Sequence, residues 1–271
     1  MILMQHVANS VQKSGKRRRG EGMKVACLTD RGKVRQHNED SCGFYQNKDG
    51  QTLAVVADGM GGHRAGDVAS TMTTSILKEY WEQSESLHTP DSAENWLVDH
   101  IQKVNNRLFE HAKNNSECHG MGTTVVAAIC TPTFSSVAHI GDARCYLLNG
   151  SGYKQLTDDH SLVNELVKSG QITKEDAEHH PRKNVILRAL GTELTVDVDV
   201  TTVILEEEDY LLLCSDGLSN KVSESEMIDI LHNGQEIESK VEKLVHLAND
   251  YGGEDNISVV IVDYSSNSES R

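Results

Sequence analysis

The chain has 271 residues, of which 37% are hydrophobic and 25% are charged, and its formal net charge is −15. This length allows one large domain or two small ones, and the composition is typical of a soluble globular protein. No stretch approaches the roughly 18 apolar residues of a membrane span. The strongly acidic balance argues against nucleic acid as a partner.

The first 22 residues have no hydrophobic periodicity and contain the basic cluster Lys16-Arg17-Arg18-Arg19. Such a cluster could bind nucleic acid or a membrane surface, belong to a disordered leader, or precede a natural start at Met23. We predict a disordered basic leader over 1–22 and a tail over 265–271. The six cysteines form no Cys-x-x-Cys pair, so we expect reduced core residues of a cytosolic protein, not a disulfide framework or a zinc site. They are Cys27, Cys42, Cys118, Cys130, Cys145 and Cys214.

A first strand is predicted over residues 24–29, followed by a charged turn that contains Arg35, Glu39 and Asp40. This turn is either a solvated loop or a site with an arginine for an anion and acids for a cation. The apolar run 53–57 then predicts a buried strand that stops at Asp58 and a group of glycines. Asp58 could be a metal ligand or a turn residue that caps the next helix.

Two helices should follow, because apolar residues recur at helical spacing. In the first, Val68, Met72, Ile76 and Tyr80 recur every four residues. The second begins after Pro90, where Asp91 and Glu94 resemble a capping box. Its core-facing stripe is predicted to be Leu97, Ile101, Val104, Leu108 and Ala112, and Trp96 is also assigned to the core.

The next part of the chain predicts strands over 125–130, 136–140 and 145–148, with a hairpin turn at Asn149 and Gly150. Residues 157–184 are polar and helical in pattern, and we expect them to form a surface insertion. Strands over 198–205 and 210–214 follow, the second ending next to Asp216. A capping box at Ser223 opens a helix with Met227, Ile230 and Leu231 inward. Another helix, with Ile237, Val241, Leu244, Val245 and Ala248 in its stripe, precedes a last strand over 257–262.

The order of these elements does not alternate between strand and helix, as a parallel doubly wound sheet requires. It favours an α+β fold in which two packed, mainly antiparallel sheets are flanked by pairs of helices. Several acids stand at the edges of the apolar runs beside Gly, Asn or Ser. A set of oxygen ligands alone selects Mg²⁺ or Mn²⁺ over zinc. These acids are Glu39, Asp40, Asp58, Asp142, Asp216 and Asp255.

Eight short motifs follow one another along 23–264. They are Arg35-x-x-Asn38-Glu39-Asp40, Asp58-Gly59-Met60-Gly61-Gly62, Gly122-Thr123-Thr124, Gly141-Asp142-Ala143-Arg144, Leu156-Thr157-x-Asp159-His160-Ser161, Ala189-Leu190-Gly191, Ser215-Asp216-Gly217 and Gly253-Glu254-Asp255-Asn256. Any one motif is weak, but all of them in order are highly specific. In this order they resemble the motifs of the metal-dependent (Mg/Mn) serine/threonine protein phosphatases of the PPM or type 2C family, in its short bacterial branch.

The resemblance implies an α-β-β-α sandwich over 23–264 with its metals at one end of the sheets and a flap over about 157–184. Asp58 would bridge two metals and the Gly59 carbonyl would add a ligand. Asp216 and Asp255 would complete the first metal's ligands, and Glu39 and Asp40 would serve the second, directly or through waters. Asp142 with Asp216 would hold a weaker third metal, and Arg35 would bind the substrate phosphate.

The implied reaction is direct attack on phosphoserine or phosphothreonine by a hydroxide that bridges two Mn²⁺ or Mg²⁺ ions, without a covalent intermediate. Relatives in eukaryotes place a His where Met60 stands, so the acid that protonates the leaving group is a metal-bound water or else His63. Ala143 stands where Ser is more usual. The alternatives are a non-catalytic regulatory module of the same family, and a phosphatase of small molecules. The expected partners are phosphorylated proteins, a bacterial Ser/Thr kinase and its substrates among them, acted on by a cytoplasmic monomer.

Overall fold

The computed structural model describes residues 12–13, 23–61 and 65–265. The expected leader and tail therefore lie almost wholly outside the described residues. Two sheets form the centre of the molecule, and every strand pairing in them is antiparallel. The first sheet has the order β1 (Gln12–Lys13), β2 (Lys24–Asp30), β12 (Ile257–Asp263), β11 (Tyr210–Cys214), β8 (Arg144–Asn149) and β9 (Gly152–Gln155).

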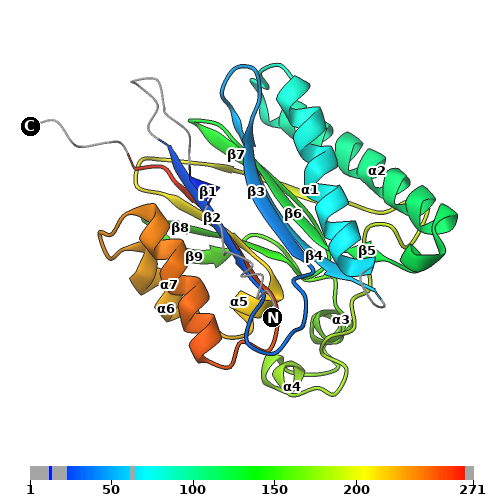
Figure 1. Cartoon of the computed structure of the whole chain (residues 1–271). Helices are drawn as coiled ribbons and strands as arrows, with labels where there is room; N and C mark the ends of the chain where they lie inside the picture. The colour runs from blue at the N-terminus through cyan, green and yellow to red at the C-terminus, as the bar shows by residue number, and fades with distance from the viewer. Residues whose placement is uncertain (1–11, 14–22, 62–64, 266–271) are drawn as a thin grey trace, which may run out of the picture.

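The second sheet has the order β10 (Asp199–Ile204), β7 (Phe134–Ile140), β6 (Val125–Cys130), β4 (Thr52–Met60) and β3 (Asp40–Gln46). The short strand β5 (Gly122–Thr123) pairs with the end of β4. Helices α1 (Ala65–Gln83) and α2 (Pro90–Asn114) cover this sheet, and α6 (Glu224–Leu231) and α7 (Ile237–Asp250) cover the other (Figure 1). The α-β-β-α sandwich is confirmed.

The strands have two apolar faces because both sides of each sheet are covered. In β4, Leu53 and Val55 pack toward α1 and α2, whereas Ala54 and Val56 pack between the two sheets. The other sheet has the same alternation, so three apolar layers hold the four structural layers together. The sandwich is therefore rigid at the strand ends, where the candidate acids stand.

The helical stripes of α2, α6 and α7 are buried as predicted. The prediction for α1 is partly wrong, because its buried face is centred on Ala69, Leu77 and Trp81, with Ile76. Val68, Met72 and Tyr80 pack only at the margin of that core. The indole Nε1 of Trp81 donates to the carbonyl of Tyr45 at 3.1 Å, and this contact orients the ring inward.

The cap of α2 also differs from the prediction. Thr89 is the N-cap, and it forms a reciprocal capping box with Ser92, not with Glu94. Pro90 occupies the first helical position, which suits its fixed φ and its missing N–H group. Glu94 instead accepts a hydrogen bond from the hydroxyl of Thr202 at 2.6 Å.

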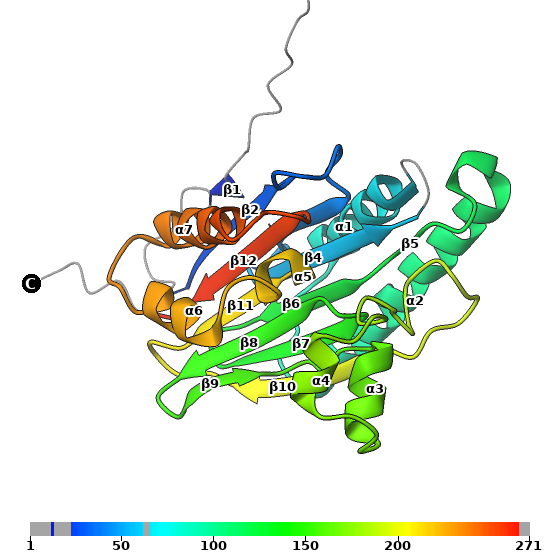
Figure 2. The same ribbon diagram turned by 90° about the horizontal axis from the view of Figure 1, so that it is seen from below.

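The polar segment 157–184 contains two short helices, α3 (Leu162–Lys168) and α4 (Lys174–Glu178), which have no fully buried residue. They lie together below the end of the sandwich (Figure 2). We call residues 157–184 the flap from here on. None of the six cysteines, all of which lie in the described residues, forms a disulfide bond, and only Cys42 among them is partly exposed. No helix among the described residues is long and apolar enough to cross a membrane.

Candidate metal-dependent active site

Asp40 and Asp58 stand directly opposite each other in the pairing of β3 with β4. The backbone of Asp58 is held on its other side by the Gly122-Thr123-Thr124 segment. Thr124 N–H and Thr123 Oγ1 each donate to the Asp58 carbonyl at 2.8 Å. Asp58 N–H donates to Thr124 Oγ1 at 3.1 Å. These hydrogen bonds on both sides of the Asp58 backbone fix the position of its carboxylate.

Gly59 lies in a close approach that only a residue without a side chain can make. A Cβ at this position would lie 2.0 Å from the Gly66 carbonyl oxygen and 2.6 Å from that of Glu39. Gly59 N–H donates to the same Glu39 carbonyl at 3.1 Å. The glycine after Asp58 thus brings Glu39 and the first turn of α1 against the end of β4.

The first sheet contributes Asp216 and Asp255 next to its paired strands β11 and β12. Ser215, which precedes Asp216, donates from its hydroxyl to Asp40 Oδ2 at 2.7 Å. This bond crosses from one sheet to the other and joins the two pairs of acids. Asn220, the C-cap of the short helix α5 (Asp216–Ser219), donates to Asp216 Oδ2 at 3.1 Å.

Asn256 organises the charged turn before β3. Its Oδ1 accepts from the Glu39 N–H at 2.8 Å, and its Nδ2 donates to the carbonyls of Arg31 and His37 at 2.8 and 3.0 Å. Sequence reasoning assigned no role to Ser215 or Asn256. Their place beside acids in the Ser215-Asp216-Gly217 and Asp255-Asn256 motifs was the available signal.

Burial and the repulsion between neighbouring acids raise the pKa values of these carboxylates. Burial, and then the neighbouring acids, raise the pKa of Asp58 well above its ordinary value. Burial raises the pKa of Asp40 to about 7 and that of Asp216 to about 6. Burial also raises the pKa of Glu39. Converging carboxylates of this kind are stabilised by a cation.

The donor set fits a hard divalent ion. Asp40 Oδ1 is buried and has no hydrogen-bond partner, so it is available as a ligand. All the acids offer oxygen, which suits Mg²⁺ or Mn²⁺. In the described residues, no three of these carboxylates have oxygens within 4.8 Å of one another. An ion here would therefore take few carboxylates directly and keep water molecules, as Mg²⁺ usually does.

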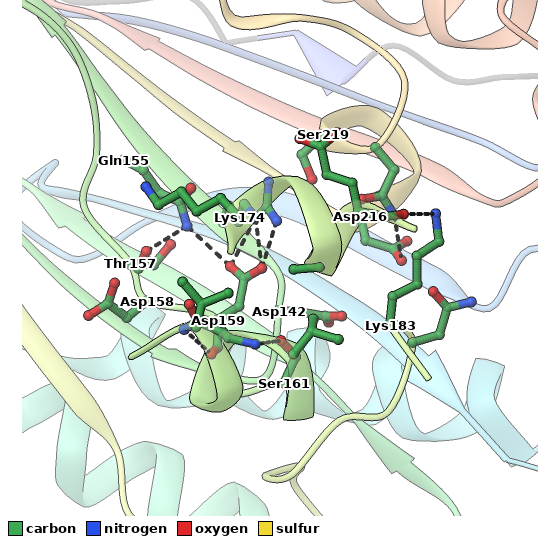
Figure 3. Close-up of a pocket in the computed structure, with 18 of the residues that line it drawn as sticks. Asp142, Gln155, Thr157, Asp158, Asp159, Ser161, Lys174, Lys183, Asp216 and Ser219 are labelled. Carbon is green, nitrogen blue, oxygen red and sulfur yellow. Dashed lines mark hydrogen bonds and ion pairs between the residues drawn. The ribbon is translucent and has the colours of Figure 1, made fainter. Parts of the chain in front are cut away.

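Asp142 follows β7 at the turn that Gly141 makes with a φ of +98°. Burial, and then the charge of Asp216, raise the pKa of Asp142 to about 7. Both acids line a cavity of about 810 Å³ between the flap and the segment 219–223 (Figure 3). The structure therefore groups Asp142 with Asp216 at the flap side of the site.

Arg144 and Asp159 line the same cavity and were not predicted as site residues. Arg144 Nε donates to Asp159 Oδ1 at 2.9 Å and its Nη2 donates to Oδ2 at 2.6 Å (Figure 3). Although burial opposes the charge, the hydrogen bond to Asp159 raises the pKa of Arg144. This bidentate pair fastens the start of the flap to β8.

Arg35 lies beside Asp255, to whose Oδ2 its Nη2 donates at 2.8 Å. This hydrogen bond raises the pKa of Arg35. Met60 ends β4 opposite Gly122. His63, the alternative acid, falls outside the described residues. The structure thus brings an arginine and six acids to one end of a two-sheet sandwich, an arrangement that suits a metal-dependent phosphatase.

Comparison with known proteins gives the same class. A family described as "Protein phosphatase 2C" matches residues 29–258. The chain belongs to the protein phosphatase 2C family. It is 50% identical over 235 residues to "Serine/threonine phosphatase stp" of Listeria welshimeri, which covers 87% of this chain and 93% of that protein.

Two solved structures extend the comparison. The crystal structure of serine/threonine phosphatase Stp1 from Staphylococcus aureus has a TM-score of 0.85 at 39% identity, covering 92% of this chain and 99% of that one. The catalytic domain of serine threonine protein phosphatase PstP, in complex with two manganese ions, has a TM-score of 0.78 at 34% identity, covering 89% of this chain and 97% of that one.

Proposed function

We propose that this protein is a Mn²⁺- or Mg²⁺-dependent protein phosphatase that hydrolyses phosphoserine and phosphothreonine. The observation that carries the proposal is the pairing of Asp40 with Asp58 across β3 and β4, joined through Ser215 to the Asp216 side of the other sheet. Membership of the protein phosphatase 2C family over residues 29–258 supports it.

The described residues suit two core ions. Asp58 would bridge them, with the Gly59 carbonyl as a further ligand. Asp216 and Asp255 would serve one ion, and Glu39 and Asp40 would serve the other, directly or through water molecules. When bound, such ions lower the pKa of water and neutralise negative charge on the phosphate. The manganese pair in the PstP catalytic domain supports this number of ions. Asp142, with Asp216, would hold a weaker third.

Arg35 would bind the substrate phosphate. A guanidinium matches two phosphate oxygens at once, and Arg35 is half-exposed beside Asp255, where a phosphate can reach it. Arg35 would thereby orient the phosphorus toward the acids and offset charge on its oxygens in the transition state.

The leaving alkoxide of serine or threonine needs a proton, which the thioether of Met60 cannot supply. Asp142 faces the flap-side cavity with Asp216, so a water oriented there would be the proton donor. His63 remains the second candidate. The cavity would also receive the chain of a phosphorylated protein, a bacterial kinase or its substrates among them, and we expect a monomeric enzyme that works in the cytoplasm.

The test compares three kinds of substrate with purified protein. Mn²⁺-dependent release of phosphate from phosphoserine and phosphothreonine peptides is expected, at rates above those for metabolite phosphates. A faster reaction on metabolites would establish the small-molecule phosphatase instead. Tight Mn²⁺ binding with no turnover of any substrate, p-nitrophenyl phosphate included, would establish a non-catalytic binding module.

A further inference from the structure

A second cluster of titratable side chains lies next to the Gly141–Asp142 turn, outside the candidate metal site. It consists of His139 on β7, His160 in the flap and Asp199 on β10, whose possible ligand atoms all lie within 4.8 Å of one another. The two imidazoles are buried, at 5% and 4% exposure, and they stack with centroids 4.6 Å apart. Asp199 pairs directly with His139 across the two strands.

This cluster is already satisfied as a hydrogen-bonded group, which argues against a metal there. His139 Nε2 donates to the Asp158 carbonyl at 2.9 Å. His160 Nε2 lies 3.2 Å from Asp199 Oδ2, and the Arg188 guanidinium donates to Asp199 Oδ1 at 2.9 Å. A metal at Asp199 would have to displace this cation.

The bonds of His160 define its tautomer. The Gly141 N–H can only donate, so His160 Nδ1 accepts from it, at 3.1 Å. The proton of the neutral ring is then on Nε2, directed at Asp199. Burial lowers the pKa of His160, which favours the neutral ring. The His160 N–H also donates to the Gly141 carbonyl at 2.9 Å, so two bonds join these residues.

Gly141 links His160 to the candidate metal site. A Cβ on Gly141 would lie 2.5 Å from the Thr124 side chain, so the turn rests directly on Thr124. Thr124 donates from its N–H to the Asp58 carbonyl at 2.8 Å, and Asp142 is the next residue after Gly141. On the flap side, Leu187 N–H donates to the His160 carbonyl at 2.7 Å, which joins the segment that follows the flap to the start of the flap.

We propose that His160, oriented by Asp199, is a positioning residue that couples the flap to the Gly141–Asp142 turn and thereby sets the affinity of the weak cation position at Asp142. This inference rests on the function proposed above. It assigns to His160 no contact with substrate or metal. Its effect passes through the Gly141 backbone.

The first measurement is calorimetric Mn²⁺ titration of the full chain. His160→Ala should weaken the weak site by roughly tenfold or more, the scale seen when a group that orients a metal ligand is removed, and leave two tight sites unchanged. In His160→Asn, the amide oxygen can take the place of Nδ1 and accept from Gly141, so most of the affinity should return. Asp199→Ala should weaken the site as well. The matched control, Asp197→Ala, changes an exposed acid on the same segment and should have no effect.

The second measurement, hydrogen exchange of the metal-free protein, does not depend on activity. Peptides that contain Gly141 and the flap ends should exchange faster in His160→Ala, by more than the peptides of β11 and β12, and near the wild-type rate in His160→Asn. Wild-type exchange in His160→Ala, or equal Mn²⁺ affinity in all variants, would overturn the proposal. If the wild-type protein proves inactive, the proposed function fails while the exchange comparison still decides the coupling.

Discussion

Arg35 and Asp255 are 220 residues apart in the chain, and Arg35 Nη2 lies 2.8 Å from Asp255 Oδ2. The pair links the charged turn before β3 to the loop before β12. The two side chains are 51% and 37% exposed, so the pair contributes little to stability. The pair instead orients Arg35, because it holds the guanidinium at the exposed edge of the carboxylate cluster, where a phosphate would enter.

The first prediction is that Arg35→Ala raises KM and leaves the content of tightly bound metal unchanged. The physical reason is that Arg35 would bind phosphate and hold no metal. Removing a charged hydrogen-bond partner typically costs about 2–5 kcal/mol. Steady-state kinetics with p-nitrophenyl phosphate, together with metal analysis of the purified variant, check this.

Arg35→Lys is the matched control. It keeps the positive charge and loses the planar fork, so KM should fall between those of Arg35→Ala and wild type. Loss of metal with an unchanged KM would show that Arg35 supports the metal site instead.

Asp58→Asn should abolish turnover while the fold survives. The substitution removes the proposed bridging carboxylate, but it also removes a buried charge that Asp40 and Asp216 repel. The metal-free variant should therefore melt no lower than wild type at pH 8. Circular dichroism and phosphatase assays check both parts. Turnover within about tenfold of wild type would exclude a bridging role.

The raised carboxylate pKa values predict how the stability of the metal-free protein depends on pH. A folded-state pKa above the unfolded value contributes stability that is complete at low pH and is lost as pH rises through the folded pKa. The relevant folded values are about 7 for Asp40 and Asp142 and about 6 for Asp216, against about 4 in the unfolded chain. The melting temperature in a chelator should fall between pH 5 and pH 8.

Mn²⁺ should reverse this trend, because it binds the deprotonated carboxylates. A ligand at about 100 times its dissociation constant adds about 2.7 kcal/mol to the free energy of unfolding. For a domain of this size, that raises the melting temperature by about 5–10 °C. Asp40→Asn should flatten the pH dependence in the chelator. Exposed acids with a lowered pKa, such as Asp49 and Glu254, titrate below this window. A melting temperature that rises from pH 5 to pH 8 without metal would contradict the prediction.

Asp142→Ala should keep two tight metals and a normal melting temperature. Asp142 stands with Asp216 at the flap-side cavity, where a water could protonate the leaving oxygen. Turnover of phosphoserine peptides should fall by about 10²–10⁴, the usual contribution of general acid catalysis. The loss should be smaller for p-nitrophenyl phosphate, whose phenolate leaves without a proton. Equal losses on both substrates would remove the leaving-group role, and loss of the tight metals would place Asp142 in the core site.

The amino-acid pattern alone was sufficient for the fold class and for most of the elements, although it did not predict strand β3, whose first residue was assigned to a charged turn. The stripes of α2, α6 and α7 repeat at helical spacing, and the runs in β4, β11 and β12 are apolar on both faces because both faces are buried. Because these apolar runs mark where the strands end, each motif acid could be placed next to a strand. These features depend on neighbours within a few residues, which a linear pattern records.

Only the tertiary structure decided which groups meet. The pairing of Asp40 with Asp58 depends on the register of β3 against β4, and the bond from Ser215 to Asp40 depends on how two sheets stack. The exact face of α1 and the Thr89 cap follow from packing and from one proline. The link from His160 to Gly141 joins segments that no short-range periodicity connects. Register and cross-sheet contacts come from the summed burial of distant residues, so local sequence could nominate the site residues but could not give their geometry.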